Sequence, residues 1–371
     1  MNEHAKQGSS SDPQNDAQHW DVLPVISLAG WFSQDPVQRL LVAQRLFKAA
    51  TSSGFFYIAD HGIDQALIDA AYEANKSFHD QPQDWKERYS ITKSMHHRGY
   101  VSIADNGAHE IEGKPHFNHH ESFDLSFDLA ADDPRTHKGY GLAGPNIWPA
   151  LDGFKDVVSA YYAALYQLGR EITSAFELGL GLAPGTLLQH FNAPTSQLRL
   201  MKYPPNDAPK DDTNHGIGAH SDFECFTMLH TQGPGLQVMS ADDHWVEAPP
   251  IEGAYIVNIG DCLEAWTGGL FKSTQHRVVN LGNLRYSLPL FFAADFDVDI
   301  APLPKFSTPQ TCAQYPAFIA GEHLWARTID AFPYLRRKYQ SGELGVDFMV
   351  SDENPFKRLS KEEAALKQPE Q

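Results

Sequence analysis

Two short motifs and a histidine between them bring together residue types that can bind a metal ion. The first motif is His220-Ser221-Asp222, and His276 follows 56 positions after its histidine. Two imidazoles and one carboxylate can bind a single iron ion from one side and leave its other positions open. Open positions matter because an organic molecule and dioxygen must reach the iron together. We therefore interpret His220, Asp222 and His276 as ligands of one Fe(II) ion.

The second motif, Arg285-Tyr286-Ser287, begins nine positions after the second histidine. Residues i and i+2 of a strand project to the same face, so Arg285 and Ser287 can point together into a barrel. A guanidinium binds a carboxylate through two parallel hydrogen bonds, and the hydroxyl adds a third. Because a buried arginine without an anion is costly, we predict an acid ligand here. The same i, i+2 rule predicts that His220 and Asp222 lie on one strand.

Neither motif identifies the site by itself, because both recur. The chain has 18 histidines and 47 acidic residues, and the first pattern also occurs at His19-Trp20-Asp21 and His119-His120-Glu121. The latter precedes a predicted strand, but it lacks a third ligand in a similar strand setting and an acid anchor downstream of it. Arg88-Tyr89-Ser90 repeats the second motif in a helical or turn context, where i and i+2 diverge. What distinguishes the predicted site is the order of the motifs on successive strands, with His276 between them.

The residues that carry these motifs belong to a region of short strands that begins at about residue 196. Gly, Pro, Asp and Asn separate the apolar runs. So many strands without helices between them indicate an antiparallel sandwich or barrel. The predicted strands are 196–203, 224–231, 235–240, 254–259, 262–266, 273–280 and 285–293, and a helix follows at about 318–339.

The region before residue 196 mixes strands with helices. Its strands are predicted at 23–28, 54–59 and 121–126, and its helices at 36–50, 64–80 and 150–182. The helix at 150–182 has the most regular pattern, because its apolar residues recur every three or four positions on one face. We expect that face to pack against a sheet.

The composition is that of an ordinary globular protein. Its 371 residues are 42% hydrophobic and carry a formal net charge of -18. An acidic surface repels phosphate groups, so nucleic acid and anionic membranes are poor partners. The three cysteines, Cys225, Cys262 and Cys312, are odd in number and far apart, and we expect them to be free core residues. With no leader peptide or membrane-spanning run, we expect a monomeric cytoplasmic protein.

Taken together, these residues make the chain similar to the iron and 2-oxoglutarate-dependent oxygenases of the isopenicillin N synthase-like family. The resemblance covers roughly residues 22–340. The segments that carry it are Leu198-Arg199-Leu200-Met201-Lys202-Tyr203-Pro204-Pro205, Gly218-Ala219-His220-Ser221-Asp222-Phe223, Gly235-Leu236-Gln237-Val238, Val257-Asn258-Ile259-Gly260-Asp261 and Ser273-Thr274-Gln275-His276-Arg277-Val278, together with Gly54-Phe55-Phe56, His61-Gly62-Ile63 and Trp148-Pro149 upstream.

The resemblance implies a mainly β fold, a double-stranded β-helix (jelly roll) with flanking helices and a helical N-terminal part. It implies that the three metal ligands bind Fe(II), with no further catalytic side chain. It also implies that 2-oxoglutarate chelates the iron while Arg285 and Ser287 hold its distal carboxylate. Tyr203 matches a tyrosine that lies at the cosubstrate or substrate carboxylate in the family. Where many relatives have an asparagine two residues earlier, this chain has Met201.

The resemblance further implies an organisation and an activity. We expect a disordered tail at 1–20, an N-terminal α/β region at 21–195 that packs on the core, the jelly-roll core at 196–300, a C-terminal helical closure at 301–351 and a polar tail at 352–371. The implied reaction is oxidation of a small organic molecule with release of succinate and CO2. Hydroxylation is the default outcome, and desaturation or ring closure depends on how the substrate radical is held.

Two alternatives remain open at this point. One is an iron-dependent oxidase that does not use 2-oxoglutarate, in which Arg285 and Ser287 hold the substrate's own carboxylate. The other is a non-catalytic barrel that binds a metal or an acid. The sequence does not choose a substrate. Residues 92–130 are expected to form part of the pocket wall, and Phe223, Glu224 and Phe292 are candidates for lining it.

Overall fold

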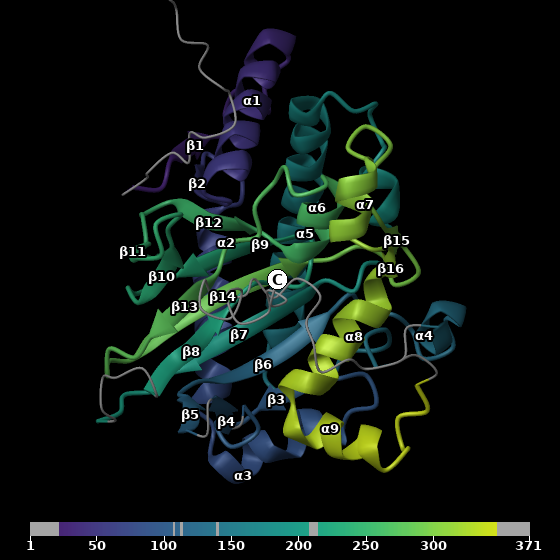
Figure 1. Ribbon diagram of the computed structural model, residues 1–371. Helices are drawn as coiled ribbons and strands as arrows, with labels where there is room; N and C mark the ends of the chain where they lie inside the picture. Colours follow the sequence, from purple (N-terminus) through teal and green to yellow (C-terminus); the bar gives the residue numbers. More distant parts are fainter. Residues whose placement is uncertain (1–21, 107, 112–113, 139–140, 208–213, 347–371) are drawn as a thin grey trace, which may run out of the picture.

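The computed structural model describes residues 22–346, apart from 107, 112–113, 139–140 and 208–213 (Figure 1). The tails predicted at 1–20 and 352–371 lie outside the described residues. The described strands are β1 (Val25–Ser27), β2 (Phe55–Ala59), β3 (Gly99–Val101), β4 (Ala108–Ile111), β5 (Lys114–Asn118), β6 (Glu121–Ser126), β7 (Gln197–Tyr203), β8 (Asn214–His220), β9 (Phe226–Thr231), β10 (Leu236–Met239), β11 (Trp245–Glu247), β12 (Ala254–Ile259), β13 (His276–Val279), β14 (Arg285–Phe292), β15 (Asp299–Ile300) and β16 (Phe318–Ile319). The described α-helices are α1 (Pro36–Ser52), α2 (Gln65–His79), α3 (Gln83–Lys86), α4 (Pro134–Lys138), α5 (Phe154–Leu180), α6 (Asp261–Trp266), α7 (Pro309–Gln314), α8 (Ala320–Ala331) and α9 (Pro333–Gln340).

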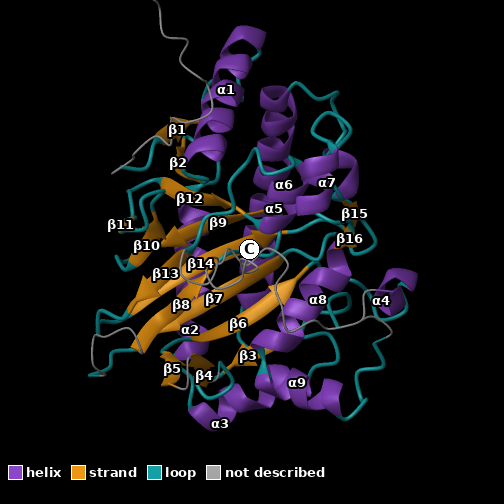
Figure 2. Cartoon of the chain, in the orientation of Figure 1, coloured by secondary structure: helices purple, strands orange, loops and turns teal. Residues whose placement is uncertain are grey.

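Two large sheets dominate the fold (Figure 2). The larger has the strand order β1-β2-β12-β9-β14-β7-β6-β3, and the smaller has the order β11-β10-β13-β8-β5-β4. Among the described strands of these sheets, β1–β2 and β5–β8 pair in parallel and the other neighbours pair antiparallel. A hydrophobic cluster that includes Tyr203 and Val278 joins the facing sides of the two sheets. This is the antiparallel double-sheet arrangement that the strand spacing predicts.

Four strands of the N-terminal region extend the larger sheet at both of its ends, and two others, β5 and β4, extend the smaller sheet beside β8. β1 and β2 lie beside β12, while β6 and β3 lie beside β7. Backbone hydrogen bonds therefore join segments that are more than a hundred residues apart in sequence. The division of the chain at residues 195–196 stays a prediction.

Helix α5 covers the face of the larger sheet that points away from the smaller sheet. Its buried side chains belong to the same hydrophobic cluster as Leu198 of β7 and Leu290 of β14. The fit is close at Gly169, where a Cβ atom would lie 2.4 Å from the ring of Phe292. The helix ends at Gly181 (φ 60), whose left-handed conformation suits glycine. The predicted helix at 150–182 and its packing against a sheet are confirmed.

One predicted strand, 262–266, is wrong, because these residues belong to helix α6. Every residue of α6 is buried, so neither a helical nor a strand period is visible in its sequence. The preceding residue, Gly260, packs closely against the backbone, and a Cβ atom there would lie 2.3 Å from the carbonyl oxygen of Glu224. The chain turns at this glycine and enters a helix, where the prediction continued the sheet.

The predicted helix at 318–339 is also corrected, because the structure divides it into α8 and α9. Phe332 separates them with an extended backbone (φ -110, ψ 113). The cause is Pro333, which disfavours a helical conformation in the preceding residue and has no N–H to donate. The break lets α8 lie across the sheets while α9 turns away (Figure 1).

The structure also tests the expectations that the cysteines are free core residues and that the chain has no membrane-spanning segment. All three cysteines are free; Cys225 and Cys262 are buried as predicted, whereas Cys312 is exposed. Cys312 lies in α7, a helix none of whose residues is buried. Within the described residues, we find no helix with the length and apolar character needed to span a membrane.

Candidate active site

A cavity of about 500 Å³ lies between the two sheets. Alternate residues of two adjacent strands form much of its wall, because successive side chains of a strand point to opposite faces. The leucines between them belong to the hydrophobic cluster that includes the buried side chains of α5. The cavity-facing residues of these strands are Gln197, Arg199, Met201 and Tyr203 of β7 and Arg285, Ser287, Pro289 and Phe291 of β14.

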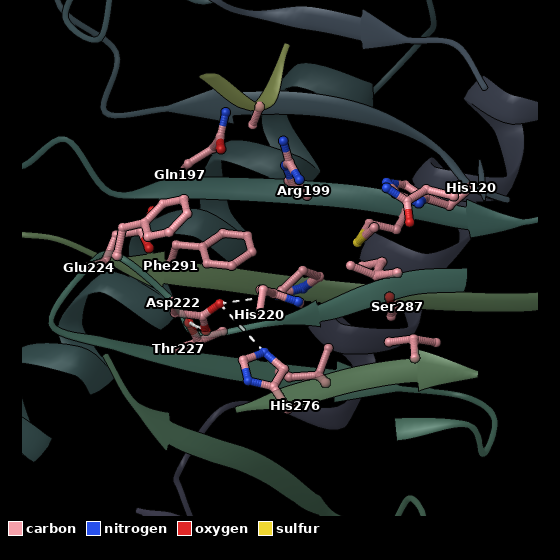
Figure 3. A pocket seen from close by; sticks show the side chains of 18 of the residues that line it. His120, Gln197, Arg199, His220, Asp222, Glu224, Thr227, His276, Ser287 and Phe291 are labelled. Carbon is pink, nitrogen blue, oxygen red and sulfur yellow. Dashed lines mark hydrogen bonds and ion pairs between the residues drawn. The ribbon is translucent and has the colours of Figure 1, made fainter. Parts of the chain in front are cut away.

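The three predicted metal ligands meet in this cavity (Figure 3). One donor atom from each of His220, Asp222 and His276 lies within 4.8 Å of the others. The two Nε2 atoms lie 3.6 Å and 3.5 Å from the same oxygen, Oδ1 of Asp222. The histidines face each other because β8 and β13 pair antiparallel with these two residues in register. Among the described residues, this is the one group of His, Cys, Asp and Glu side chains whose spacing suits a metal ion.

Asp222 does not lie on the strand that carries His220, contrary to the prediction. β8 ends at His220, and Asp222 follows in a turn whose carbonyl accepts a hydrogen bond from Asp261 N at 2.8 Å. That bond ties the turn to the start of α6 and brings the carboxylate back toward the histidines. The sequence also predicts no strand at 214–220, because its two glycines and polar residues show no apolar alternation.

Hydrogen bonds hold each ligand with one donor atom turned inward. Thr227 Oγ1 and Asn258 Nδ2 both donate to Oδ2 of Asp222, the latter at 2.6 Å, which leaves Oδ1 for the metal position. Nδ1 of His220 lies 2.8 Å from Gly218 O, and Nδ1 of His276 lies 3.2 Å from Thr274 O. Because a carbonyl only accepts, each Nδ1 carries the proton and each Nε2 keeps a free lone pair.

The protonation states also suit a metal ion. Burial and the neighbouring His276 lower the pKa of His220 to about 4, so its imidazole is neutral near pH 7. Burial alone would raise the pKa of Asp222, but the two histidines and its hydrogen bonds lower it. A neutral imidazole and an ionised carboxylate are the forms that bind a divalent cation. The protonation states of His220 and Asp222 therefore suit iron binding.

A second group of polar atoms lies farther along β14. Nη1 and Nη2 of Arg285 and Oγ of Ser287 are buried without a hydrogen-bond partner among the described residues. Arg285 is held in place by a 3.1 Å bond from Nε to Gly233 O and by the Tyr203 ring, 4.5 Å from its guanidinium carbon. An unpaired buried guanidinium is costly, so these atoms fit an anionic group such as a carboxylate.

The structure adds His120 to this end of the cavity. Its Nδ1 lies 2.8 Å from Gly216 O, and its buried Nε2 has no partner among the described residues. Its ring lies 5.7 Å from that of Tyr203. Burial lowers the pKa of His120 to about 3, so the side chain is neutral. His120 is the middle residue of a rejected motif, and its own position carries no sequence signal.

The opposite end of the cavity contains a charged residue that the sequence did not single out. Arg199 Nε donates to Asp124 Oδ2 at 2.9 Å, and Ser122 Oγ donates to the other oxygen at 2.7 Å. The Arg199 guanidinium carbon lies 5.8 Å from the centre of the Phe291 ring and 5.7 Å from that of Phe332. Asp124 is fully buried beneath it. Strand alternation indicates only that Arg199 shares a face with Tyr203, and its acidic partner comes from another part of the sheet.

Helix α8 closes this end of the cavity. Leu324, Thr328 and Ala331 line it from one side of the helix, and Phe332 follows them. Their spacing of three or four residues keeps them on one helical face. His97 anchors the helix that follows α8, because its Nδ1 lies 2.7 Å from the hydroxyl of Tyr334 in α9.

The rejected motifs have other partners. Glu121 accepts hydrogen bonds from Lys86 Nζ at 2.7 Å and from Tyr100 Oη at 2.6 Å, so its carboxylate is already paired. Arg88 lies in a short 3-10 helix (Glu87–Tyr89), as its context predicts. The triplet at His19 lies outside the described residues.

The predictions about the cavity wall are largely confirmed, with one correction. The segment 92–130 supplies His97, Arg98, Asn106, Asn118 and His120, and both Phe223 and Glu224 line the cavity as predicted. Phe292 does not line it. Strand alternation turns Phe292 toward α5, where it packs against Gly169, and presents Phe291 to the cavity instead.

Comparisons with known proteins identify the family of the chain. The family model for the non-haem dioxygenase in morphine synthesis N-terminal region matches residues 23–151, and that for the 2OG-Fe(II) oxygenase superfamily matches residues 194–294. A 2-oxoglutarate-dependent dioxygenase of Didymella fabae is 32% identical over 300 residues, which cover 77% of this chain and 90% of that protein. A homoarginine-6-hydroxylase of Oryza sativa subsp. japonica is 30% identical over 307 residues, 79% of this chain and 90% of that protein.

A solved structure supports the fold. The crystal structure of a 2OG-Fe(II) oxygenase family protein from Caulobacter crescentus superposes with a TM-score of 0.72 at 31% identity, covering 84% of this chain and 99% of that one. The predicted jelly roll is therefore confirmed, as are iron and 2-oxoglutarate as cofactor and cosubstrate. The chain belongs to the 2OG-Fe(II) oxygenase superfamily and is a non-haem Fe(II)- and 2-oxoglutarate-dependent dioxygenase that oxidises a small molecule.

Proposed function

We propose that His220, Asp222 and His276 bind the catalytic Fe(II), and that Arg285 and Ser287 bind the distal carboxylate of 2-oxoglutarate. The three unpaired polar atoms of Arg285 and Ser287, buried on the same strand, are the observation that carries this assignment. The iron and 2-oxoglutarate supply the oxidation, in which dioxygen and 2-oxoglutarate are converted to succinate and CO2 as the substrate is hydroxylated.

The residues of the chain would position the reactants and exclude water. Thr227 and Asn258 hold the Asp222 carboxylate in one orientation. The Tyr203 ring beneath Arg285 would keep the guanidinium aimed along the cavity. We therefore retain Tyr203 as a residue of the 2-oxoglutarate site that contributes packing, since its hydroxyl contacts Met201 Sδ at 3.8 Å.

The substrate would occupy the opposite end of the cavity, beneath α8. Gln197, Arg199 and Glu224 supply the polar groups there, and Phe291 and Phe332 supply apolar surface. Arg285 and Phe291 lie six residue steps apart along β14, or about 20 Å at roughly 3.3 Å per residue. That length accommodates 2-oxoglutarate and a small substrate on either side of the metal position. Hydroxylation is the proposed outcome, because it is the default reaction of the family that the chain belongs to.

The charge and the cysteines support a proposal about the setting of this enzyme. A net charge of -18 is unfavourable for nucleic-acid binding, and the buried thiols of Cys225 and Cys262 suit a reducing compartment. We propose a monomer in the cytoplasm without a nucleic-acid partner. Light scattering after gel filtration measures the oligomeric state, and a dimer at micromolar concentration would contradict it.

Replacing Arg285 with glutamine tests the cosubstrate assignment. We expect the KM for 2-oxoglutarate to rise about 30- to 100-fold, because two charge-assisted hydrogen bonds are lost, while iron affinity stays the same. Succinate formation by iron-loaded protein is the measurement. Arg277→Gln is the matched control, since Arg277 lies on the adjacent sheet, bonds to Gln237 and does not line the cavity.

The same assay separates the two alternative functions. An oxidase that does not need 2-oxoglutarate would consume dioxygen with substrate without forming succinate. A non-catalytic binding protein would not decarboxylate 2-oxoglutarate even slowly, and Asp222→Ala would change nothing. Either result would contradict the proposed function.

A further inference from the structure

The two ends of the cavity differ in a way that bears on the substrate. In Figure 3 the three metal ligands lie between Ser287 on one side and Glu224 on the other. The Ser287 end presents donors, whereas Glu224 presents a carboxyl group. The substrate, which the proposed function places at the Glu224 end, therefore meets a different kind of partner from that of 2-oxoglutarate.

The position of Glu224 is rigid. Its carbonyl oxygen accepts a hydrogen bond from Cys262 N at 3.2 Å and would lie 2.3 Å from a Cβ atom at residue 260. The next residue is tied to β14, since Cys225 N donates to Phe292 O at 3.0 Å. With the backbone held on both sides, the side chain is directed into the cavity, which it lines beside Phe223.

The Glu224 carboxyl lacks a donor from any other described residue. It is 8% exposed, and its hydrogen bond comes from its own backbone N–H. A carboxyl group keeps an acceptor oxygen in either protonation state. Burying it without a further partner is unfavourable, so a ligand that brings a donor gains binding energy here.

Arg199 lines the same cavity but offers hydrogen-bond donors, whereas the carboxyl group of Glu224 offers an acceptor. Its Nε is used by Asp124, while its Nη atoms make no hydrogen bond within the described part of the chain. Asp124 forms an ion pair with Arg199, and Glu224 forms no ion pair with another described residue. A ligand that fits both residues presents an N–H group to Glu224 and an oxygen acceptor to Arg199, with its apolar part between Phe291 and Phe332.

We propose that Glu224 is a specificity-determining residue that accepts a hydrogen bond from an N–H group of the substrate, which is a small nitrogenous compound such as an amine, guanidine, lactam or cyclic urea. The inference rests on the proposed function for the location of the substrate. It names a chemical class and not a particular compound.

The test uses pairs of compounds that differ at one nitrogen. Alkyl amines, alkyl guanidines, lactams and cyclic ureas are each paired with an analogue in which the N–H is methylated or replaced by oxygen. Calorimetry on the protein loaded with iron and 2-oxoglutarate measures their Kd values for wild type, Glu224→Leu and Glu252→Leu. Glu252 is an exposed loop acid outside the cavity and serves as the matched control.

For at least one class, we expect wild type and Glu252→Leu to prefer the N–H member at least tenfold, the scale of leaving a buried polar group without its hydrogen-bond partner. In Glu224→Leu the preference should fall below about threefold. If no N–H member is preferred tenfold, or if Glu224→Leu weakens both members of each pair equally, the inference is wrong. Glu224→Met, which keeps the length of the side chain without its carboxyl oxygens, repeats the comparison if the leucine variant does not fold, and it should lose the preference in the same way.

Substrate-stimulated succinate release provides the second readout. The same N–H compounds should stimulate it more than their analogues do in wild type. Because binding is measured separately, a preference for N–H compounds without succinate formation would contradict the proposed function and leave the Glu224 inference supported.

Discussion

Asp222 shows at the scale of one residue how the site is built. One carboxylate oxygen accepts hydrogen bonds from Thr227 and Asn258, and the other lies about equally far from the two histidines. Its backbone carbonyl is bonded as well, so neither the turn nor the side chain can rotate freely. A ligand held before the metal arrives loses less entropy on binding.

Thr227→Val tests this arrangement at the residue scale. Valine keeps the shape of threonine but removes the donor to Asp222, so we expect iron affinity to fall about 10- to 100-fold. Competition with a chelator measures that affinity. Thr173→Val is the control, because Thr173 is also buried but bonds to the backbone of α5, away from the cavity. Equal affinities in the two variants would show that Thr227 does not orient the ligand.

Strand β14 shows at the scale of an element how one segment serves both the site and the core. Arg285, Ser287 and Phe291 face the cavity, while Leu290 and Phe292 face α5. The two functions are separated only because successive side chains of a strand point to opposite faces of the sheet. A change on one face should therefore leave the other largely unaffected.

The adjacent phenylalanines of β14 test this separation. Phe292→Ala should lower the free energy of unfolding by about 3–5 kcal/mol, because a fully buried ring is removed from a close-packed interface with α5. Phe291→Ala should cost clearly less stability and weaken substrate binding instead. Urea unfolding followed by circular dichroism measures the first effect. Equal losses of stability in both variants would contradict the two-faced description of the strand.

At the scale of the whole molecule, the site depends on contacts between distant parts of the chain. Glu121 at the start of β6 pairs with Lys86, the last residue of α3, and Lys202 of β7 lies 3.6 Å from the same carboxylate. This buried network joins the N-terminal region to the strand that carries Arg199 and Tyr203. C-terminal α8 lines another part of the cavity wall through Leu324, Thr328 and Ala331.

The Glu121 network should make stability depend on pH. Burial would raise the pKa of Glu121, but His79, Lys86 and Tyr100 together lower it below its ordinary value of 4.5. A lowered folded-state pKa contributes stability that is present above pH 4.5 and is lost as the pH falls further. In Glu121→Gln we expect a loss of roughly 3–5 kcal/mol at pH 7, since Lys86 loses its buried counter-ion, and a shallower decline below pH 4.5.

Unfolding by urea at several pH values between 3 and 7 measures this dependence. Glu73→Gln is the control, because Glu73 forms an exposed pair with Lys76 that contributes about 1 kcal/mol or less. If Glu121→Gln declined with pH as steeply as wild type does, other carboxylates would account for the acid sensitivity.

Much of the site could be predicted because its information is local. The residue types of His220, Asp222 and His276 suit one metal, and the alternation of β14 requires that Arg285 and Ser287 share a face. The prediction was wrong where the local sequence shows no periodic pattern, or where the pattern fits two kinds of secondary structure. Asp222 reaches the metal position through a turn and not along a strand, and residues 262–266 form a helix because buried runs show no period.

The sequence by itself indicated the proposed donor set, the antiparallel strands and the proposed acid-binding pair, since each depends on residue type and on spacing within one segment. Only the tertiary structure decided which buried groups have partners. Arg199 is paired because Asp124 lies on the neighbouring strand, whereas Glu224 meets no donor from another described side chain. Pairing depends on which segments the fold brings within about 3 Å, and this separation between distant residues is not encoded in any short stretch of the chain.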